Sequence, residues 1–218
     1  MNRRIAATMA MCGALVLLGS LLLAGCQAVF TTSLLSFLQR DPANLPADQQ
    51  VAWAEQALAS GDPQAMAQAY ELVKNNPDQA YLAASLAAEL SGVPQALADA
   101  IADLDNILSA GFDDADMQAF LDDYFASLDG PYAVEAGTHF QDVMASSPSE
   151  LTGQDIIIGA LCLVFGAVYA DGAFGSADPA EVTAADDFIS AGVTALEPDD
   201  PAIDILTEIQ SFVNSGLF

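Results

Sequence analysis

Helix-forming segments separated by regularly placed breakers dominate the pattern of this chain. From Pro46 onward, prolines and glycines divide the sequence into segments of about 12 to 18 residues that are rich in Ala, Leu, Gln and Glu, which are good helix formers. Convincing alternation of apolar and polar residues, which is typical of a strand, is absent. We therefore predict an all-α protein of about ten helices, at residues 28–40, 47–60, 63–75, 78–91, 94–109, 114–128, 131–146, 153–170, 179–196 and 201–214.

A repeat of 31 residues organises the first part of this helical region. Residues 46–75 and 77–106 are identical at 11 of 30 positions, and both contain the block Ser-Gly-x-Pro-Gln-Ala. The glycine of each block, Gly61 or Gly92, suits a left-handed cap at a helix end, and the proline after it suits the first turn of the next helix. Two helical hairpins of equal build should stack as they do in an α-solenoid.

The repeated segment resembles tetratricopeptide (TPR) repeats. Gly61-Asp62 matches the turn between the two helices of the motif. Ala54 and Ser85 match its small residue in the first helix, and Tyr70 and Ile101 match its large residue in the second. Met66 and Leu97 stand where the motif has alanine, and the repeat is three residues shorter than usual. The resemblance implies stacked helical hairpins over residues 46 to about 108.

One segment of the C-terminal half, residues 156–170, is apolar on every side of a helix. Thr152 and Asp155 resemble a capping box, with Asp in place of Glu, at the start of this helix. Fifteen helical residues span about 22 Å, which is less than the roughly 30 Å of a bilayer core, and a helix of this kind is normally central in a bundle. We predict a helical bundle over residues 111–218, packed around this helix and continuous with the repeats at 46–110.

The first 26 residues have the layout of an export signal. Arg3 and Arg4 precede an apolar run, residues 5–24, and the run ends at Leu-Ala-Gly-Cys, residues 23–26. These four residues resemble the lipobox of bacterial lipoproteins. An ordinary transmembrane anchor is the alternative, because the run has about the 20 apolar residues that a membrane helix needs.

The lipobox resemblance implies a modified N-terminus. Residues 1–25 would be removed as a signal peptide, and Cys26 would become the acylated first residue, which attaches the protein to a lipid bilayer. Residues 26–45 would then comprise the lipidated N-terminus and a first helix. Gln27 stands where the inner-membrane retention signal of the family has Asp, so we expect the outer membrane of the cell envelope rather than the inner one.

Acidic residues far outnumber basic ones. The whole chain carries a net charge of −26, and removal of residues 1–25 would leave only Arg40 and Lys74 against 30 acids, a net charge of −28. Nucleic acid is then not expected as a partner, because phosphate binding requires clustered lysines and arginines. We interpret the acidic surface as solubilising, with loose Ca²⁺ association as the alternative.

Few side chains point to catalysis or metal binding. His139 is the only histidine, and we expect it to be a partly buried packing residue. Cys162 lies in the apolar segment and should be a small buried hydrophobe. Acid clusters such as 113–116 open helices, where carboxylates favour the helix dipole, although a carboxylate pair for glycoside hydrolysis could come from distant positions. We expect no enzymatic activity, no cofactor and no bound metal.

The sequence therefore favours a lipid-anchored scaffold of the cell envelope that binds a protein or peptide partner. The partner would lie in the concave surface that stacked hairpins form. Polar residues are expected to line this groove, namely Gln50, Gln56, Gln64 and Tyr81. The alternative is a periplasmic lipoprotein that binds a small ligand or assists transport, with a pocket beside residues 156–170.

Overall fold

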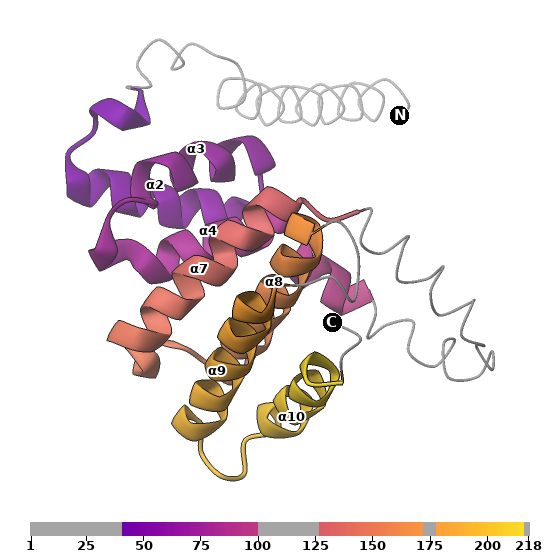
Figure 1. Ribbon diagram of the computed structural model, residues 1–218. Coiled ribbons are helices and arrows are strands. Elements are labelled where there is room, and N and C mark those ends of the chain that lie inside the picture. The colour runs from indigo at the N-terminus through magenta and orange to yellow at the C-terminus, as the bar shows by residue number, and fades with distance from the viewer. Residues whose placement is uncertain (1–40, 100–126, 172–177, 216–218) are drawn as a thin grey trace, which may run out of the picture. The chain divides into compact units, whose positions relative to one another are not determined.

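The computed structural model describes residues 41–99, 127–171 and 178–215. All regular secondary structure in these ranges is helical, which confirms the all-α prediction for this part of the chain (Figure 1). Nine of the ten predicted helices fall wholly or partly on described residues, and eight of them contain a helix there. The exception is the predicted helix 114–128, whose two described residues, Ser127 and Leu128, form a turn and a bend. The features that lie outside the described residues are the predicted helix 28–40, the acidic segment 113–116, Ile101 and Cys26.

The chain divides into two compact units, Met1–Leu45 and Pro46–Phe218. The described residues of the first unit form one short 3-10 helix, η1 (Pro42–Asn44). Its start is capped by Asp41, whose side chain accepts a hydrogen bond from Ala43 N at 3.1 Å. The other described helices all belong to the second unit.

The first helical hairpin of the second unit consists of α2 (Ala47–Ser60) and α3 (Pro63–Val73). α2 ends at Gly61, whose φ of 65° lies in the left-handed region that glycine adopts without strain. The side chain of Asp62 then accepts a hydrogen bond from Gln64 N at 2.9 Å, which caps α3. The repeated block thus ends one helix and begins the next, as the sequence predicts.

The second repeat has the same turn between its helices. It consists of η2 (Pro77–Gln79), α4 (Ala80–Ser91) and a helical stretch at residues 93–99. Gly92, after α4, has a φ of 80°. The serine hydroxyl before each of the two glycines donates to a backbone carbonyl three residues earlier, at 2.7 Å in the first repeat and 2.6 Å in the second.

α7 (Gly130–Ser146) lies against the second hairpin. Asp129 N donates to Ser91 O at 2.9 Å, so α7 begins beside the end of α4. The side chain of Asp129 also accepts from Tyr132 N at 3.4 Å, which caps the helix. α7 then packs along α4 on one side and along α8 (Gly153–Asp171) on another (Figure 1).

The start of α8 has the capping box that the sequence predicts. Thr152 N donates to Asp155 Oδ2 at 2.8 Å, and Asp155 N donates back to Thr152 Oγ1 at 3.3 Å. These two bonds satisfy amides that would otherwise lack a partner at the helix end. A short 3-10 helix, η3 (Pro148–Glu150), connects α7 to this cap.

α8 packs against α7, α9 (Pro179–Ala195) and α10 (Ala202–Val213). The 18-residue window Gly153–Ala170 is long and apolar enough to cross a membrane, and 61% of it is buried inside the protein. Its glycines allow close packing. At Gly166, an added Cβ would lie 3.1 Å from the Cα atom of Val134 in α7.

One hydrophobic core runs through the second unit. It extends from Ala54 in α2, through the alanine-rich face of α4, to Val213 in α10. Small side chains bring the helices close together, and a few large ones fill the space between them. The largest side chains that are fully buried include Tyr70, Phe140, Leu86 and Ile156.

Candidate functional site

Of the four residues that the sequence suggests for a binding groove, Tyr81 lines a surface hollow. It lies at the start of α4 with 37% of its surface exposed. Gln50 is half-buried in α2, and Gln56 and Gln64 are exposed in α2 and α3. None of these three glutamines lines the hollow.

The hollow beside Tyr81, which we call the acidic hollow, has a volume of about 390 Å³. Three separate segments of the chain build it. They come together because α4 packs on α2, and because η3 contributes a residue to the same hollow. Its lining comes from α2, from η2 and α4, and from η3, and consists of Glu55, Leu58, Ala59, Asp78, Gln79, Tyr81, Leu82 and Glu150.

Among the described residues, the charged groups that line the acidic hollow are all carboxylates. Glu55, Asp78 and Glu150 are all exposed, and none of them forms an ion pair with another described residue. Leu58 and Leu82 are more buried than the carboxylates and add apolar surface to the lining. The hollow thus combines an apolar floor with a negatively charged rim.

Tyr81 is held in place by the cap of α8. Its hydroxyl donates to both carboxylate oxygens of Asp155, at 3.4 Å each. Burial, the charge of Asp155 and the charge of Glu150 raise the pKa of Tyr81, so its hydroxyl stays a neutral donor at physiological pH. The capping carboxylate therefore has a second role, which is to orient an exposed aromatic ring.

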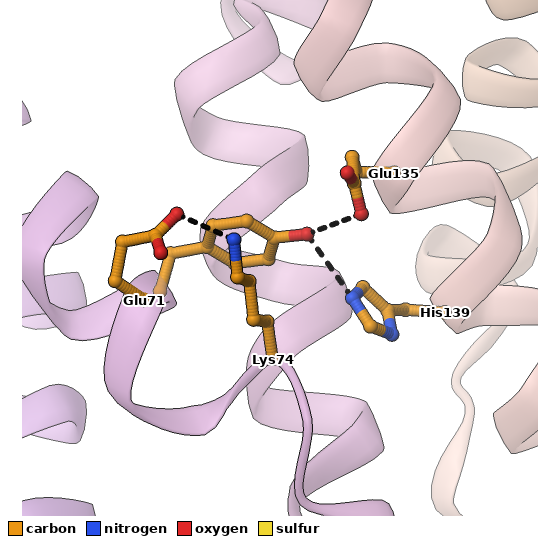
Figure 2. Close-up of polar contacts among 5 residues, drawn as sticks. Glu71, Lys74, Glu135 and His139 are labelled. Atoms are coloured by element: carbon orange, nitrogen blue, oxygen red, sulfur yellow. Dashed lines mark hydrogen bonds and ion pairs between the residues drawn. The ribbon is translucent and has the colours of Figure 1, made fainter.

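A second group of polar residues, which we call the Tyr70 cluster, lies between α3 and α7 (Figure 2). The hydroxyl of Tyr70 donates to Glu135 Oε2 at 2.7 Å and lies 3.2 Å from His139 Nε2. On the α3 side, Lys74 Nζ lies 2.7 Å from Glu71 Oε1 and 5.6 Å from the centre of the Tyr70 ring. The only lysine and the only histidine of the chain therefore meet around one buried tyrosine.

One proton arrangement fits the donors and acceptors of the Tyr70 cluster. A phenol has a single proton, and the Tyr70 hydroxyl donates it in a hydrogen bond to the carboxylate of Glu135. The matching tautomer of His139 carries its proton on Nε2 and donates to the oxygen of Tyr70. The cluster is a chain of hydrogen bonds that runs from His139 through Tyr70 to Glu135.

Burial moves two pKa values in this cluster away from neutrality. It raises the pKa of Tyr70 far above its usual value, and the hydrogen bond to Glu135 and the charge of Glu135 add to the rise. Burial also lowers the pKa of His139, although the charges of Glu135 and Asp142 act in the opposite direction. Tyr70 thus remains protonated, and His139 is biased toward its neutral form.

The Tyr70 cluster is suited to holding helices together. No serine, threonine or cysteine nucleophile takes part in it, and no three His, Cys, Asp or Glu side chains converge as metal ligands anywhere in the described ranges. Sequence reasoning expected His139 to be a packing residue and missed its bond to Tyr70. The spacing of Glu135 and His139, four residues apart on one helix face, was the available signal.

Cys162 is fully buried in α8, as the sequence predicts, and burial raises the pKa of its thiol to about 12. A smaller hollow of about 160 Å³ lies next to it. This hollow is bordered by α7 and α9, and side chains such as Val134, Gln141 and Leu163 line it. The thiol is protonated at neutral pH and is a poor nucleophile.

Comparison with protein-family models, with curated proteins and with solved structures gave no significant match. The geometry of the chain alone therefore defines the candidate site. It comprises one surface hollow, which has acidic residues and an exposed tyrosine, and one cluster of hydrogen bonds between helices. Of the two, the acidic hollow is the one with room for another molecule.

Proposed function

We propose that this protein is a lipid-anchored scaffold of the bacterial cell envelope that binds a protein or peptide partner at the acidic hollow. In this proposal, acylated Cys26 attaches the protein to the membrane, the outer one rather than the inner one. The hairpins of the two repeats stack as a short, TPR-like solenoid that supports the hollow. The observation that carries the proposal is the hollow itself, with its volume of about 390 Å³ and its exposed aromatic ring.

Tyr81 has the properties of an anchor for a partner. Tyrosine is enriched at protein interfaces, because its ring offers a large apolar surface and its hydroxyl a polar group. Here the hydroxyl is held by Asp155, so little side-chain freedom would be lost on binding. Leu58 and Leu82 provide apolar surface beside the ring.

We infer no enzymatic role. The hydroxyl of Tyr70 is hydrogen-bonded to Glu135 and lies 3.2 Å from His139 Nε2. A tyrosine whose pKa is raised by burial does not readily give up its proton, and Lys74 is paired with Glu71. These contacts support a structural role for the Tyr70 cluster.

The alternative function is the binding of a small ligand, and the hollow beside Cys162 is the observation that favours it. Its volume of about 160 Å³ is well below the roughly 300 to 1,000 Å³ of typical ligand pockets. Native mass spectrometry of the purified protein tests this alternative. A bound lipid or metabolite that is lost when Ala184, which lines this hollow, is replaced by Leu would favour ligand binding over the scaffold.

Site-specific photocrosslinking in intact cells tests the scaffold. A benzophenone amino acid at position 81 should form a crosslink to one dominant protein. The control is the same amino acid at Tyr169, which is 57% exposed in α8 and does not line the acidic hollow. The scaffold proposal is wrong if position 81 gives no crosslink, or if both positions give the same products at the same yield.

A further inference from the structure

We infer that the segment seated in the acidic hollow is basic, and that it places a lysine or arginine side chain against the ring of Tyr81, between the carboxylates of the rim. This inference rests on the proposed function, because it names the chemistry of the partner at the same hollow. The occupant to which it commits is a peptide segment of another protein.

The shape and polarity of the acidic hollow match such a side chain. Lysine and arginine have an apolar stem and a charged end, and they bury the stem on apolar surface while the end stays near water or counter-charges. Leu58 and Leu82 lie where the stem would pack, and Glu55, Asp78 and Glu150 lie where the charge would be received. Tyr81, which is 37% exposed and lines the same hollow, would attract the cation through its aromatic ring.

The chain itself contains an example of this recognition. In the Tyr70 cluster, Lys74 Nζ lies 5.6 Å from the centre of a tyrosine ring and 2.7 Å from a carboxylate oxygen of Glu71 (Figure 2). The acidic hollow offers the same two elements, a tyrosine ring and nearby carboxylates. Lys74 is the only basic residue among the described residues other than His139, and it is already used in the first arrangement.

Charge excludes most other occupants. An anionic partner would be repelled by the three acids of the rim and by a net charge of −26 on the chain. A metal ion would need carboxylates that converge on one point, and no set of three His, Cys, Asp or Glu side chains in the described ranges is close enough to hold one. Separate carboxylates around an apolar floor suit an extended cationic segment.

A peptide titration of the full chain in nonionic detergent tests the inference. The probe is a capped hexapeptide of alternating arginine and leucine, and its control has citrulline in place of arginine, which keeps the shape and removes the charge. Binding is measured by fluorescence anisotropy, and its position by NMR of labelled tyrosine and leucine side chains. We expect the arginine peptide to shift the signals of Tyr81, Leu58 and Leu82, and to bind at least tenfold more tightly than the citrulline peptide.

Two triple variants separate the acidic hollow from the general charge of the protein. E55Q/D78N/E150Q removes the rim, and E89Q/D187N/E208Q removes the same number and kinds of charges from exposed positions that do not line the hollow. The rim variant should weaken binding of the arginine peptide at least tenfold, and the matched variant at most twofold. Equal losses in the two variants, or equal binding of both peptides, would overturn the inference.

The crosslink from position 81 distinguishes this inference from the proposed function. Peptide mapping of the crosslinked partner identifies the segment that touches position 81. A segment with lysine or arginine next to the crosslinked residue supports the inference. A neutral or acidic segment overturns it and leaves the scaffold proposal standing, whereas absence of any crosslink removes the scaffold proposal itself.

Discussion

At the scale of single residues, Tyr70 connects two helices through its hydroxyl. The ring is 2% exposed, and the hydroxyl bonds to Glu135 and His139 of α7. Tyr70→Phe keeps the ring and removes both bonds, so we expect it to lower the free energy of unfolding by about 1 to 2 kcal/mol. Chemical denaturation measures this loss. Tyr132→Phe, in the ring that packs edge-on against Tyr70, is the control and should change stability much less. Equal losses would argue against the hydrogen bonds.

The pH dependence of stability should report on His139. Burial lowers the pKa of His139 below the unfolded value of 6.5. At pH values between the folded and the unfolded pKa, the unfolded state therefore binds more protons than the folded state. The contribution of His139 to the free energy of unfolding is therefore complete above pH 6.5, and it is lost as the pH falls from 6.5 through the folded pKa. Between pH 7 and pH 5, the unfolding free energy of the unaltered protein should fall more than that of His139→Gln. An equal or smaller fall would contradict the lowered pKa.

At the scale of elements, the paired turns of the repeats depend on backbone conformation. Gly61 and Gly92 both have positive φ, and no atom lies closer than 3.6 Å to the position of a Cβ at either glycine. Replacement by alanine should then cost mainly backbone strain, roughly 1 kcal/mol at each turn. Thermal unfolding of G61A and G92A should show similar losses. A loss at only one position would mean that the turns do not behave as equal parts of a repeat.

Helix boundaries were predictable from the sequence where a local signal set them. α2 begins after Pro46 and ends at a serine-glycine pair, and α8 begins at a capping box formed by side chains three residues apart. The sequence prediction was wrong by two residues at the end of α3. Asn76 precedes a proline and takes an extended conformation, so the helix stops earlier and a 3-10 turn begins the next one.

The candidate site was much less predictable than the helices. Sequence reasoning selected Tyr81, which lines the acidic hollow, but none of the three glutamines does. Glu55, Asp78 and Glu150 belong to three separate segments, and only tertiary packing brings them to one hollow. No periodicity along the chain carries that information. The spacing of Glu135 and His139 places both on one face of α7, but their partner Tyr70, 69 residues from His139, is brought there only by tertiary packing.

At the scale of the whole molecule, negative charge should limit stability. With 30 acidic residues and four basic ones, most carboxylates repel one another, and the described residues contain one ion pair, Lys74 with Glu71. Salt screens such repulsion, with a Debye length of about 10 Å at 0.1 M. The unfolding free energy should therefore rise as sodium chloride is added between 10 mM and 0.5 M. A flat or falling dependence would show that self-repulsion is not a main cost of folding.

The same charge bears on the proposed acylation at Cys26. A body with a net charge of −28 after removal of residues 1–25 would be repelled by anionic lipid, so in the proposed lipoprotein the acyl chains would provide the attachment. Cys26→Ser should therefore leave a full-length, unprocessed precursor. Cys12→Ser alters a cysteine within the signal segment, and it should still give the shorter lipidated form. Gel mobility and partition into detergent measure both variants, and normal maturation of Cys26→Ser would rule out the lipoprotein assignment.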